Sequence, residues 1–431
     1  MIIKPHQGKQ FIRLLTIILM LLINNRLPAQ NGLKYYMAEA LRKNPALMES
    51  MNNIHSRNLD RSLTNAQFSL PQISLTANYL FAPYFNNRQL VTTSPDSLAI
   101  GYDPSITNGG LYSAQINISK NIFNSGVINA YDTQTGLQIR NSENSIETAK
   151  HTLERDITDQ YLLTFQAQEL YKLSKALVDT LSLQLNLTQQ LMLKGLSRQT
   201  DYLLLKVELA SQQISSEQAL SVYKTGLYEL NSACGIFDTA SVNLVPVELT
   251  RSAEVNESNF LRQYSLDSLL VITQQNLMET KYLPQFSIFA NAGLNAVELN
   301  GIGRKFGMSA GINFTLPVFD GNQKSITRQQ SEISSRTIGV QKENQRITIR
   351  NKKIETASQI DVYLRNMKAI SQQLKDYEQI LRISRSELIN GQLTMIEFIT
   401  ILRNYLDLKK TEIQTNAGYQ QMINQFNYWN W

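Results

Sequence analysis

The 431-residue sequence has only one cysteine, three histidines and ten prolines. A lone Cys234 excludes a disulfide framework and any cysteine-based zinc or iron–sulfur site. His6, His55 and His151 lie far apart and in no metal-ligand spacing. The sequence also contains no P-loop, no glycine-rich dinucleotide motif and no nucleophile elbow. We therefore expect no enzyme activity, no cofactor and no metal site.

Proline is absent from two long stretches, between Pro104 and Pro246 and after Pro317. Because proline removes a backbone donor and clashes inside a helix, these stretches lack the strongest helix breaker. A continuous helix over 128–194 would be roughly 100 Å long. Apolar residues recur there, and in the second stretch, at steps of three, four or seven residues, which predicts lengthwise coiled-coil packing. They are Leu170, Leu173, Leu177, Leu181 and Leu185, and then Ile399, Leu402, Leu406 and Ile413.

The N-terminus has the layout of a secretory signal peptide, which we expect over residues 1–29. Lys4, Lys9 and Arg13 precede an apolar run over 14–23, which is too short to span a bilayer as a helix. The alternative is a buried core helix. No cysteine lies near the expected cleavage point, which argues against a lipoprotein. Removal of 1–29 takes away four basic residues and no acid, so the net charge falls from +6 to +2. A charge this small does not indicate nucleic-acid binding.

The rest of the chain carries an internal repeat. Residues 119–126 (SKNIFNSG) are echoed at 315–321 (TLPVFDG), and 195–201 (GLSRQTD) at 391–397 (GQLTMIE). Both pairs keep one offset of 196 residues, as Phe123 with Phe319 shows. This constancy predicts two duplicated halves.

Four short segments alternate apolar and polar residues with period two, as half-buried strands do. We expect strands at about 72–82, 111–120, 285–295 and 308–318. Their lengths suit tilted transmembrane strands, although an ordinary soluble sheet would show the same alternation. No later segment could form a transmembrane helix, so entry into a membrane would require a closed β-barrel. A loop rich in Asn, Ser, Pro and Gly, over 83–110, follows the first strand.

With these features in order, the mature chain resembles the TolC-type outer-membrane efflux proteins over residues 33–431. The resemblance rests on 40–47 (ALRKNPAL), the Leu-Pro-Gln start of two strands, 316–321 (LPVFDG) and the paired Gly-x5-Asp/Glu turns. It implies a mainly α fold with a membrane β-barrel: a homotrimeric duct with four strands and two long coiled-coil hairpins per protomer. A helical barrel in the periplasm, ringed by an equatorial belt, completes the expected architecture.

The expected organisation has four parts. The signal peptide (1–29) precedes a first repeat (30–235) that contains a helix, two strands and a helical hairpin at about 127–233. An inter-repeat equatorial segment occupies 236–265. The second repeat (266–431) has its two strands and a hairpin at about 322–430. We expect the C-terminal aromatics, Phe426, Tyr428, Trp429 and Trp431, to be buried in the belt rather than to form an interfacial girdle.

The resemblance also assigns candidate site residues. The first hairpin tip would contact a periplasmic adaptor through Gly195, Leu196, Thr200 and Asp201, and Gly391 marks the second tip. Glu397 would face the pore at its constriction, while Thr400 stands where a second acid would complete the ring. Both Asp201 and Glu397 could instead be first-turn acids that stabilise a helix start.

Two short motifs mark the expected exits from strand to helix, where glycine would supply the conformational freedom for a change of direction. The residues of these exits are Phe123 and Gly126 in the first half, and Pro317, Phe319, Asp320 and Gly321 in the second.

The function that follows is that of an outer-membrane channel, the passive exit duct of a tripartite efflux or type I secretion system. Its partners would be two further copies, a periplasmic adaptor, an inner-membrane pump reached through that adaptor, and membrane lipid. The alternatives are an exported structural coiled-coil protein without transport activity and an exported hydrolase. The alternating strands argue against the first, and the lack of a nucleophile–base constellation argues against the second.

Overall fold

The computed structural model describes residues 32–82, 84–85, 90–91, 109–195, 197–238, 242–296 and 299–431. The expected signal peptide, most of the expected loop over 83–110, and Leu196 lie outside the described residues. Within the described chain there are two compact units. The first comprises 32–49, 146–261 and 344–431, and the second comprises 50–145 and 262–343.

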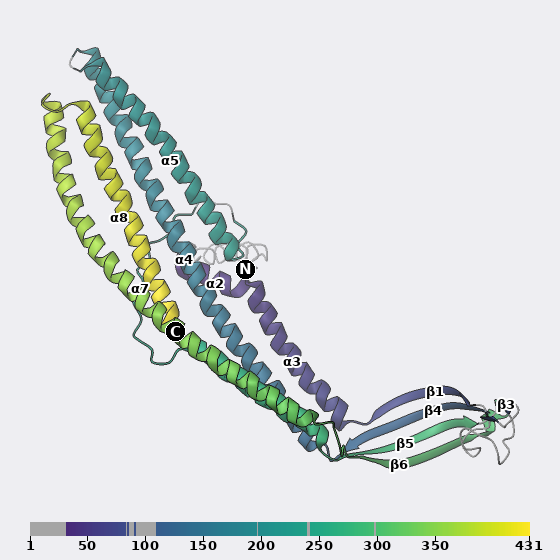
Figure 1. Cartoon of the computed structure of the whole chain (residues 1–431). Coiled ribbons are helices and arrows are strands. Elements are labelled where there is room, and N and C mark those ends of the chain that lie inside the picture. The colour runs from purple at the N-terminus through teal and green to yellow at the C-terminus, as the bar shows by residue number, and fades with distance from the viewer. Residues whose placement is uncertain are drawn as a thin grey trace, which may run out of the picture. The chain divides into compact units, whose positions relative to one another are not determined.

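Helices make up most of the described chain (Figure 1). The two longest have 69 and 67 residues, which confirms the long helices expected in the proline-free stretches. The α-helices are α2 (Leu33–Lys43), α3 (Pro45–Ser69), α4 (Ser125–Leu193), α5 (Gln199–Ala233), α6 (Arg262–Glu279), α7 (Gln323–Ile389) and α8 (Met395–Trp429). Short 3-10 turns are η1 (Asn259–Leu261), η2 (Thr280–Tyr282) and η3 (Ile302–Arg304).

The two helical hairpins of the first unit, α4 with α5 and α7 with α8, share a packed seam. Leu177 and Leu181 of α4 are buried in one cluster with Leu205 of α5, and with Ile399 and Leu406 of α8. The apolar stripes expected to support lengthwise packing therefore contact each other. Because leucines three or four residues apart lie on one helix face, this burial follows from their spacing.

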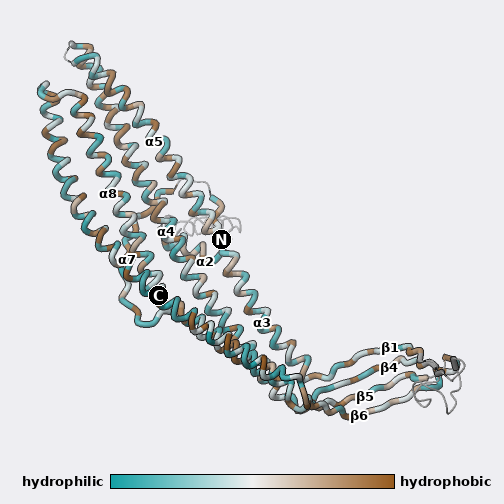
Figure 2. Tube along the Cα trace, viewed as in Figure 1, coloured by the Kyte–Doolittle hydropathy of each residue, from teal (hydrophilic) through white to brown (hydrophobic). Residues whose placement is uncertain are grey.

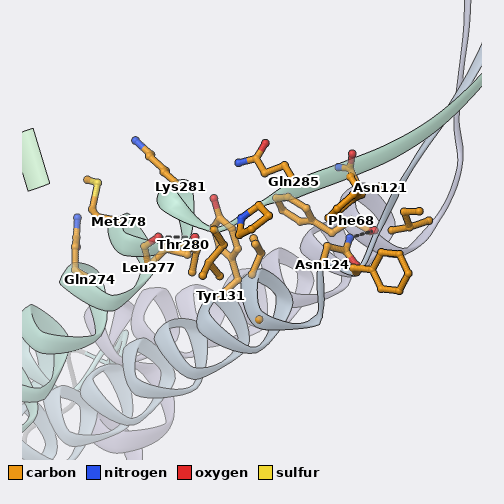
Figure 3. A pocket seen from close by; sticks show the side chains of 17 residues that line it. Phe68, Asn121, Asn124, Tyr131, Gln274, Leu277, Met278, Thr280, Lys281 and Gln285 are labelled. Carbon is orange, nitrogen blue, oxygen red and sulfur yellow. Dashed lines mark hydrogen bonds between the residues drawn. The ribbon is translucent and has the colours of Figure 1, made fainter. Parts of the chain in front are cut away.

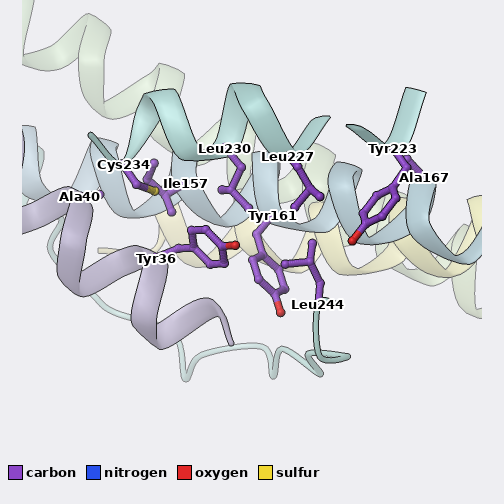
Figure 4. Close-up of a cluster of buried hydrophobic side chains, with 10 residues drawn as sticks. All are labelled: Tyr36, Ala40, Ile157, Tyr161, Ala167, Tyr223, Leu227, Leu230, Cys234 and Leu244. Atoms are coloured by element: carbon purple, nitrogen blue, oxygen red, sulfur yellow. The ribbon is translucent and has the colours of Figure 1, made fainter. Parts of the chain in front are cut away.

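A second cluster of the same unit joins α2, α4 and α5 (Figure 4). Tyr161 is fully buried and packs against Tyr36, with ring centroids 5.8 Å apart. Its hydroxyl donates to the carbonyl of Val245 at 2.7 Å, and the Val245 amide donates back to it at 3.0 Å. Gln168 forms a similar pair of hydrogen bonds with Leu244. Side chains of α4 thus provide hydrogen-bond partners for the backbone of Leu244 and Val245, which lie in a segment without regular structure.

The segment between the halves lies against the C-terminus. It lacks regular structure over 242–258, and η1 and α6 follow it, so the expected inter-repeat segment ends a few residues too late. Phe426 is 1% exposed and lies under the Arg251 guanidinium. His151 stacks on Trp431 and Tyr428, with centroids 4.4 Å and 5.0 Å away. Of the C-terminal aromatics, Phe426 and Tyr428 are buried, whereas Trp429 and Trp431 are half-buried. Their place in an equatorial belt stays a prediction.

The second unit contains a small antiparallel sheet (Figure 1). Its strands are β1 (Gln72–Ala82), β4 (Gly109–Ile122), β5 (Gln285–Ala296) and β6 (Phe306–Thr315), in the spatial order β1-β4-β5-β6. A separate pair, β2 (Tyr84–Phe85) and β3 (Leu90–Val91), lies between β1 and β4 in the sequence. The expectation of a fourth strand reaching 318 was wrong at its end. Pro317 lies just beyond and has no amide hydrogen to donate to a ladder.

Hydrophobic and hydrophilic residues are interspersed along the helices (Figure 2). Within the described ranges, none of the helices is both long and apolar enough to cross a bilayer.

Candidate functional site: a two-faced sheet and two hairpin tips

The pairing register determines which residues share a face of the sheet, since residues directly opposite each other point the same way. Ile73 pairs with Ile118, Ile118 with Ala290, and Ala290 with Ala310. Every second residue of all four strands therefore belongs to one continuous face, and almost all are apolar. Well exposed members of this face include Leu75 (75%), Met308 (81%) and Ile312 (69%).

The opposite face is polar and uncharged. Ser74, Asn117, Asn291 and Asn313 belong to it by the same register, and it also carries many glycines. The alternation expected from the sequence thus continues across the whole sheet rather than within single strands.

Phe289 is one exception to this alternation, as are the paired Leu80 and Leu111 near the loops, and the structure explains Phe289. It pairs with Gly311 on the polar face. A Cβ atom added at Gly311 would lie 2.6 Å from the Phe289 ring. The ring therefore covers the space that the missing side chain leaves.

Aromatic residues gather at both ends of the apolar face. Near the loops, the rings of Tyr79 and Tyr112 lie 4.8 Å apart. Near the helices, Phe286 packs against Phe314 at 4.8 Å and against Phe123 at 5.8 Å. The residues between these ends are aliphatic, apart from Lys120 close to the helical end.

The first exit from strand to helix differs from the expectation. Phe123, not Gly126, takes the left-handed conformation, with φ of 57°. Gly126 lies in the first turn of α4 instead. An aromatic residue rarely adopts this conformation, so the turn depends on surrounding contacts. Among them, the Asn124 side chain donates to the carbonyl of Phe68.

The second exit uses glycine as expected. Gly321 and Asn322 are left-handed, with φ of 64° and 69°. Asp320 accepts hydrogen bonds from the amides of Asn322 (2.9 Å) and Lys324 (2.8 Å), which caps the start of α7 and lowers the pKa of its carboxyl. Pro317 lies before this turn, and Phe319 is 89% exposed.

Both hairpins reverse at a left-handed glycine, with φ of 74° at Gly195 and 72° at Gly391. Their amides donate to Met192 and Leu388, each three residues earlier. This conformation carries little penalty for glycine and a substantial one for other residues. The positions of the two turns were therefore readable from the repeated glycines.

Glu397 forms a capping box with Thr394 at the start of α8. Its carboxylate accepts from the Thr394 amide at 2.9 Å and from the Thr394 hydroxyl at 2.7 Å, and these bonds lower the pKa of Glu397. The reciprocal bond runs from the Glu397 amide to the Thr394 hydroxyl. The side chain stays exposed, as does Thr400 one turn later.

The first tip lacks such a cap. The N-cap residue of α5 is Arg198, which makes no side-chain cap bond. Thr200 is exposed and Asp201 is half-buried in the first helical turn. Asp201 and Glu397 therefore have equivalent positions in the two hairpins but different surroundings.

One charged contact between the hairpins was not expected. Glu208 of α5 has a side chain only 5% exposed, and Arg403 of α8 donates to it through both Nε (3.1 Å) and a terminal nitrogen. The only sequence signal is an acid within the apolar stretch around Leu205. Among the described residues, no group of His, Cys, Asp and Glu forms a candidate metal site.

Comparison with known proteins places the fold. No protein-family model matches the sequence, and no curated protein matches it at a significant level. Solved structures do match. A membrane protein from Pseudomonas aeruginosa has a TM-score of 0.72 and 14% identity, over 92% of this chain and 90% of that one.

Two further matches are the outer membrane protein VceC from Vibrio cholerae (TM-score 0.70, 14% identity, 92% of this chain and 95% of that one) and the Campylobacter jejuni CmeC outer membrane channel (0.69, 14%, 92% and 85%). The chain therefore has the fold of TolC-type outer-membrane channels.

Proposed function

We propose that this chain is an outer-membrane channel that serves as the passive exit duct of a tripartite efflux or type I secretion system. The observation that carries the proposal is the two-faced sheet. An exposed apolar face with aromatic residues at both ends, opposite an uncharged polar face, is the pattern of strands between lipid and a water-filled lumen. A soluble protein rarely exposes so large an apolar surface.

The edges of the sheet support assembly from several copies. β1 and β6 are terminal strands, and each has only one partner in the sheet. Unpaired backbone groups are costly in lipid, so a membrane sheet must close on itself. Three copies would contribute twelve strands, enough for a barrel with a lumen. We therefore propose a homotrimer, in which β1 of one copy pairs with β6 of the next.

A stripe along α7 supports the same assembly. Five aliphatic residues recur at intervals of seven, and each is 49–68% exposed: Ile326, Ile333, Val340, Ile347 and Ile354. A heptad repeat of exposed aliphatic residues is suited to packing against another helix. A second copy of the chain is the occupant we propose.

The two hairpin tips would have different roles. In this proposal, Gly195, Leu196, Thr200 and Asp201 contact a periplasmic adaptor, and through it an inner-membrane pump. At the second tip, three copies of Glu397 would surround a narrow pore and attract cations. Both tips would lie in the periplasm, after export by the signal peptide at 1–29.

The repeat organisation belongs to the proposal as well. Residues 30–235 and 266–431 would be duplicated halves on either side of an equatorial segment. The competing function, an exported coiled-coil protein without transport activity, offers no use for an exposed apolar sheet.

The lipid-facing assignment is tested by Ile312→Arg against Asn313→Arg, neighbours on opposite faces of β6. Arginine at Ile312 should cost roughly 2–4 kcal/mol near the midplane, whereas arginine at Asn313 should be tolerated. Heat-modifiable trimer in the outer-membrane fraction is the readout. Equal assembly of the two variants would refute the assignment.

The tip roles are tested by Glu397→Gln and Asp201→Asn. Glutamine can also close a capping box, so Glu397→Gln removes charge while keeping the helix start. It should lower cation selectivity and cation block in planar bilayers without loss of trimer. Asp201→Asn should weaken adaptor cross-linking and change conductance little. The reverse pattern would exchange the two roles.

A further inference from the structure

A single charged residue interrupts the strands of the four-stranded sheet. Lys120 is the only charged residue within β1, β4, β5 and β6. It pairs with Ile288, which places it on the apolar face, two residues before the end of β4. It is exposed, and no ion pair or side-chain hydrogen bond joins its ammonium group to another described residue. A lysine on a lipid-facing surface is tolerated near the interface, where its ammonium can reach polar headgroups.

A cavity of about 360 Å³ opens at the same end of the sheet (Figure 3). Its walls are largely apolar and come from the start of α4, the end of α6 and the first residues of β5. Val127, Leu277 and Leu283 contribute aliphatic side chains. Engineered cavities of about 150 Å³ accept benzene, so this one has room for part of an acyl chain.

The cavity continues into the apolar face. Ile122 and Phe286 line it and also pair with each other across β4 and β5, on the same face as Lys120. β4 and β5 are the two central strands, and each is paired on both sides with another strand of this chain. A second copy pairing at β1 or β6 would join the sheet at its edges, away from these strands.

A second cation lies at the mouth of the cavity. The Lys281 side chain extends away from the ribbon on the same side as Gln285 (Figure 3). It is exposed, and among the described residues it has no ion-pair partner. The nearby acid Glu279 is already held by Arg328, at 2.7 and 2.8 Å, and these bonds lower its pKa to about 2. The charge of Lys281 is therefore available to an external anion.

We propose that this cavity binds one anionic phospholipid of the periplasmic leaflet. The phosphate would lie between Lys281 and the ammonium of Lys120, and an acyl chain would pass from the cavity over Ile122 and Phe286 onto the apolar face. Basic pockets at membrane boundaries recognise anionic headgroups in this way. The inference rests on the proposed membrane location and adds a ligand to the outside of the duct.

The test uses the full chain, extracted from membranes in mild detergent and delipidated by washing. Native mass spectrometry then follows binding of added phosphatidylglycerol or phosphatidylcholine. The charge variant is Lys120→Gln with Lys281→Gln, and Val127→Trp fills the cavity without a change of charge. The matched control is Arg304→Gln with Lys305→Gln, which removes two cations beside β6 at the opposite end of the sheet.

The expected result is retention of phosphatidylglycerol over phosphatidylcholine, and roughly five- to tenfold weaker binding in the charge variant. Val127→Trp should also lose the lipid, and the control should bind as the unaltered chain does. Equal binding by the charge variant, or no preference between the lipids, would overturn the inference. The inference would also be overturned if Val127→Trp changed the oligomer mass but kept its lipid. The cavity would then be occupied by a second copy of the chain rather than by the phospholipid.

Failure of this inference is separable from failure of the proposed function. If Ile312→Arg blocks membrane assembly and Asn313→Arg does not, yet no phospholipid is retained, only the lipid site is refuted. If the chain is absent from the membrane fraction, both fail together.

Discussion

The two hairpin tips begin from matching sequence landmarks and end with different chemistry. Gly195 and Gly391 adopt almost the same backbone conformation, and each is followed six residues later by an acid. At the second tip that acid is engaged in a capping box with Thr394. At the first tip the N-cap residue is Arg198, which makes no such bond. The two turns therefore share their backbone geometry but not their side-chain contacts.

The difference lies in how the backbone donors at each helix start are satisfied. Uncapped helix starts leave backbone donors for water or a partner, whereas a capping box satisfies two of them internally. The first tip thus has unsatisfied groups that an adaptor could use. The second tip holds its acid in a defined position, which suits a ring of carboxylates around a pore.

The largest effect is expected where the hairpins do not differ, in the seam they share. Leu181 is 2% exposed and packs in the cluster that joins α4, α5 and α8. Leu181→Ala should destabilise the first unit by about 2–5 kcal/mol through lost burial and a cavity. Leu181→Met, which conserves volume, should cost less than about 1.5 kcal/mol. Urea denaturation followed by circular dichroism measures both, and equal losses would show that the seam is not tightly packed.

The next effect concerns the ion pair between the hairpins. Arg403→Ala leaves the buried Glu208 carboxylate without its partner and should cost about 1–3 kcal/mol. The lower half of this range is expected because the Arg403 side chain is 59% exposed. Adding Glu208→Gln should recover part of the loss, since a neutral amide is less costly to bury. A double-mutant cycle with no coupling between the two changes would contradict this account.

The capping difference itself predicts a smaller and asymmetric effect. Thr394→Ala removes the cap of α8 and should cost about 1 kcal/mol. Arg198→Ala occupies the equivalent position in α5 and should change stability by less than about 0.5 kcal/mol. Hydrogen exchange in the first turn of each helix measures the two effects separately. Similar acceleration at both tips would remove the distinction drawn between them.

The smallest effect is a pH dependence at the second tip. Hydrogen bonds from Thr394 lower the pKa of Glu397 below its usual 4.5. A lowered pKa in the folded state means that the stabilisation is complete above 4.5 and is lost as the pH falls through the lowered value. The protection factors for hydrogen exchange at the start of α8 should therefore fall as the pH drops through this lowered pKa. Those of the Glu397→Gln variant should not. An identical profile in the two proteins would exclude the effect.

Much of the fold was predictable because it depends on local spacing. The absence of proline and the steps of three and four in Leu173, Leu177 and Leu181 indicated long packed helices, which the structure has. Alternation in Ile312 and its neighbours indicated strands, and Gly195 and Gly391 indicated the turns. Each of these signals lies within a few residues of the feature that it predicts.

The first strand exit was not predictable in the same way. The glycine at 126 suggested the turn, but Phe123 takes the left-handed conformation and Gly126 enters the helix. The contacts around this exit come from residues distant in the sequence, such as Phe286 against the Phe123 ring and Phe68 accepting from Asn124. A local rule for glycine cannot include such contacts.

Local residue patterns specify the helix lengths, the alternation of the strands and the repeated landmarks, because periodicity and backbone preference act over short distances. Which distant side chains meet follows from the folded chain. It joined four alternating strands into one apolar face, brought Arg403 to Glu208 from 195 residues away, and placed Phe426 against Arg251 and Trp431 against Phe260. These outcomes depend on register and on helix packing, which involve residues far apart in the chain, so no single stretch of sequence contains them.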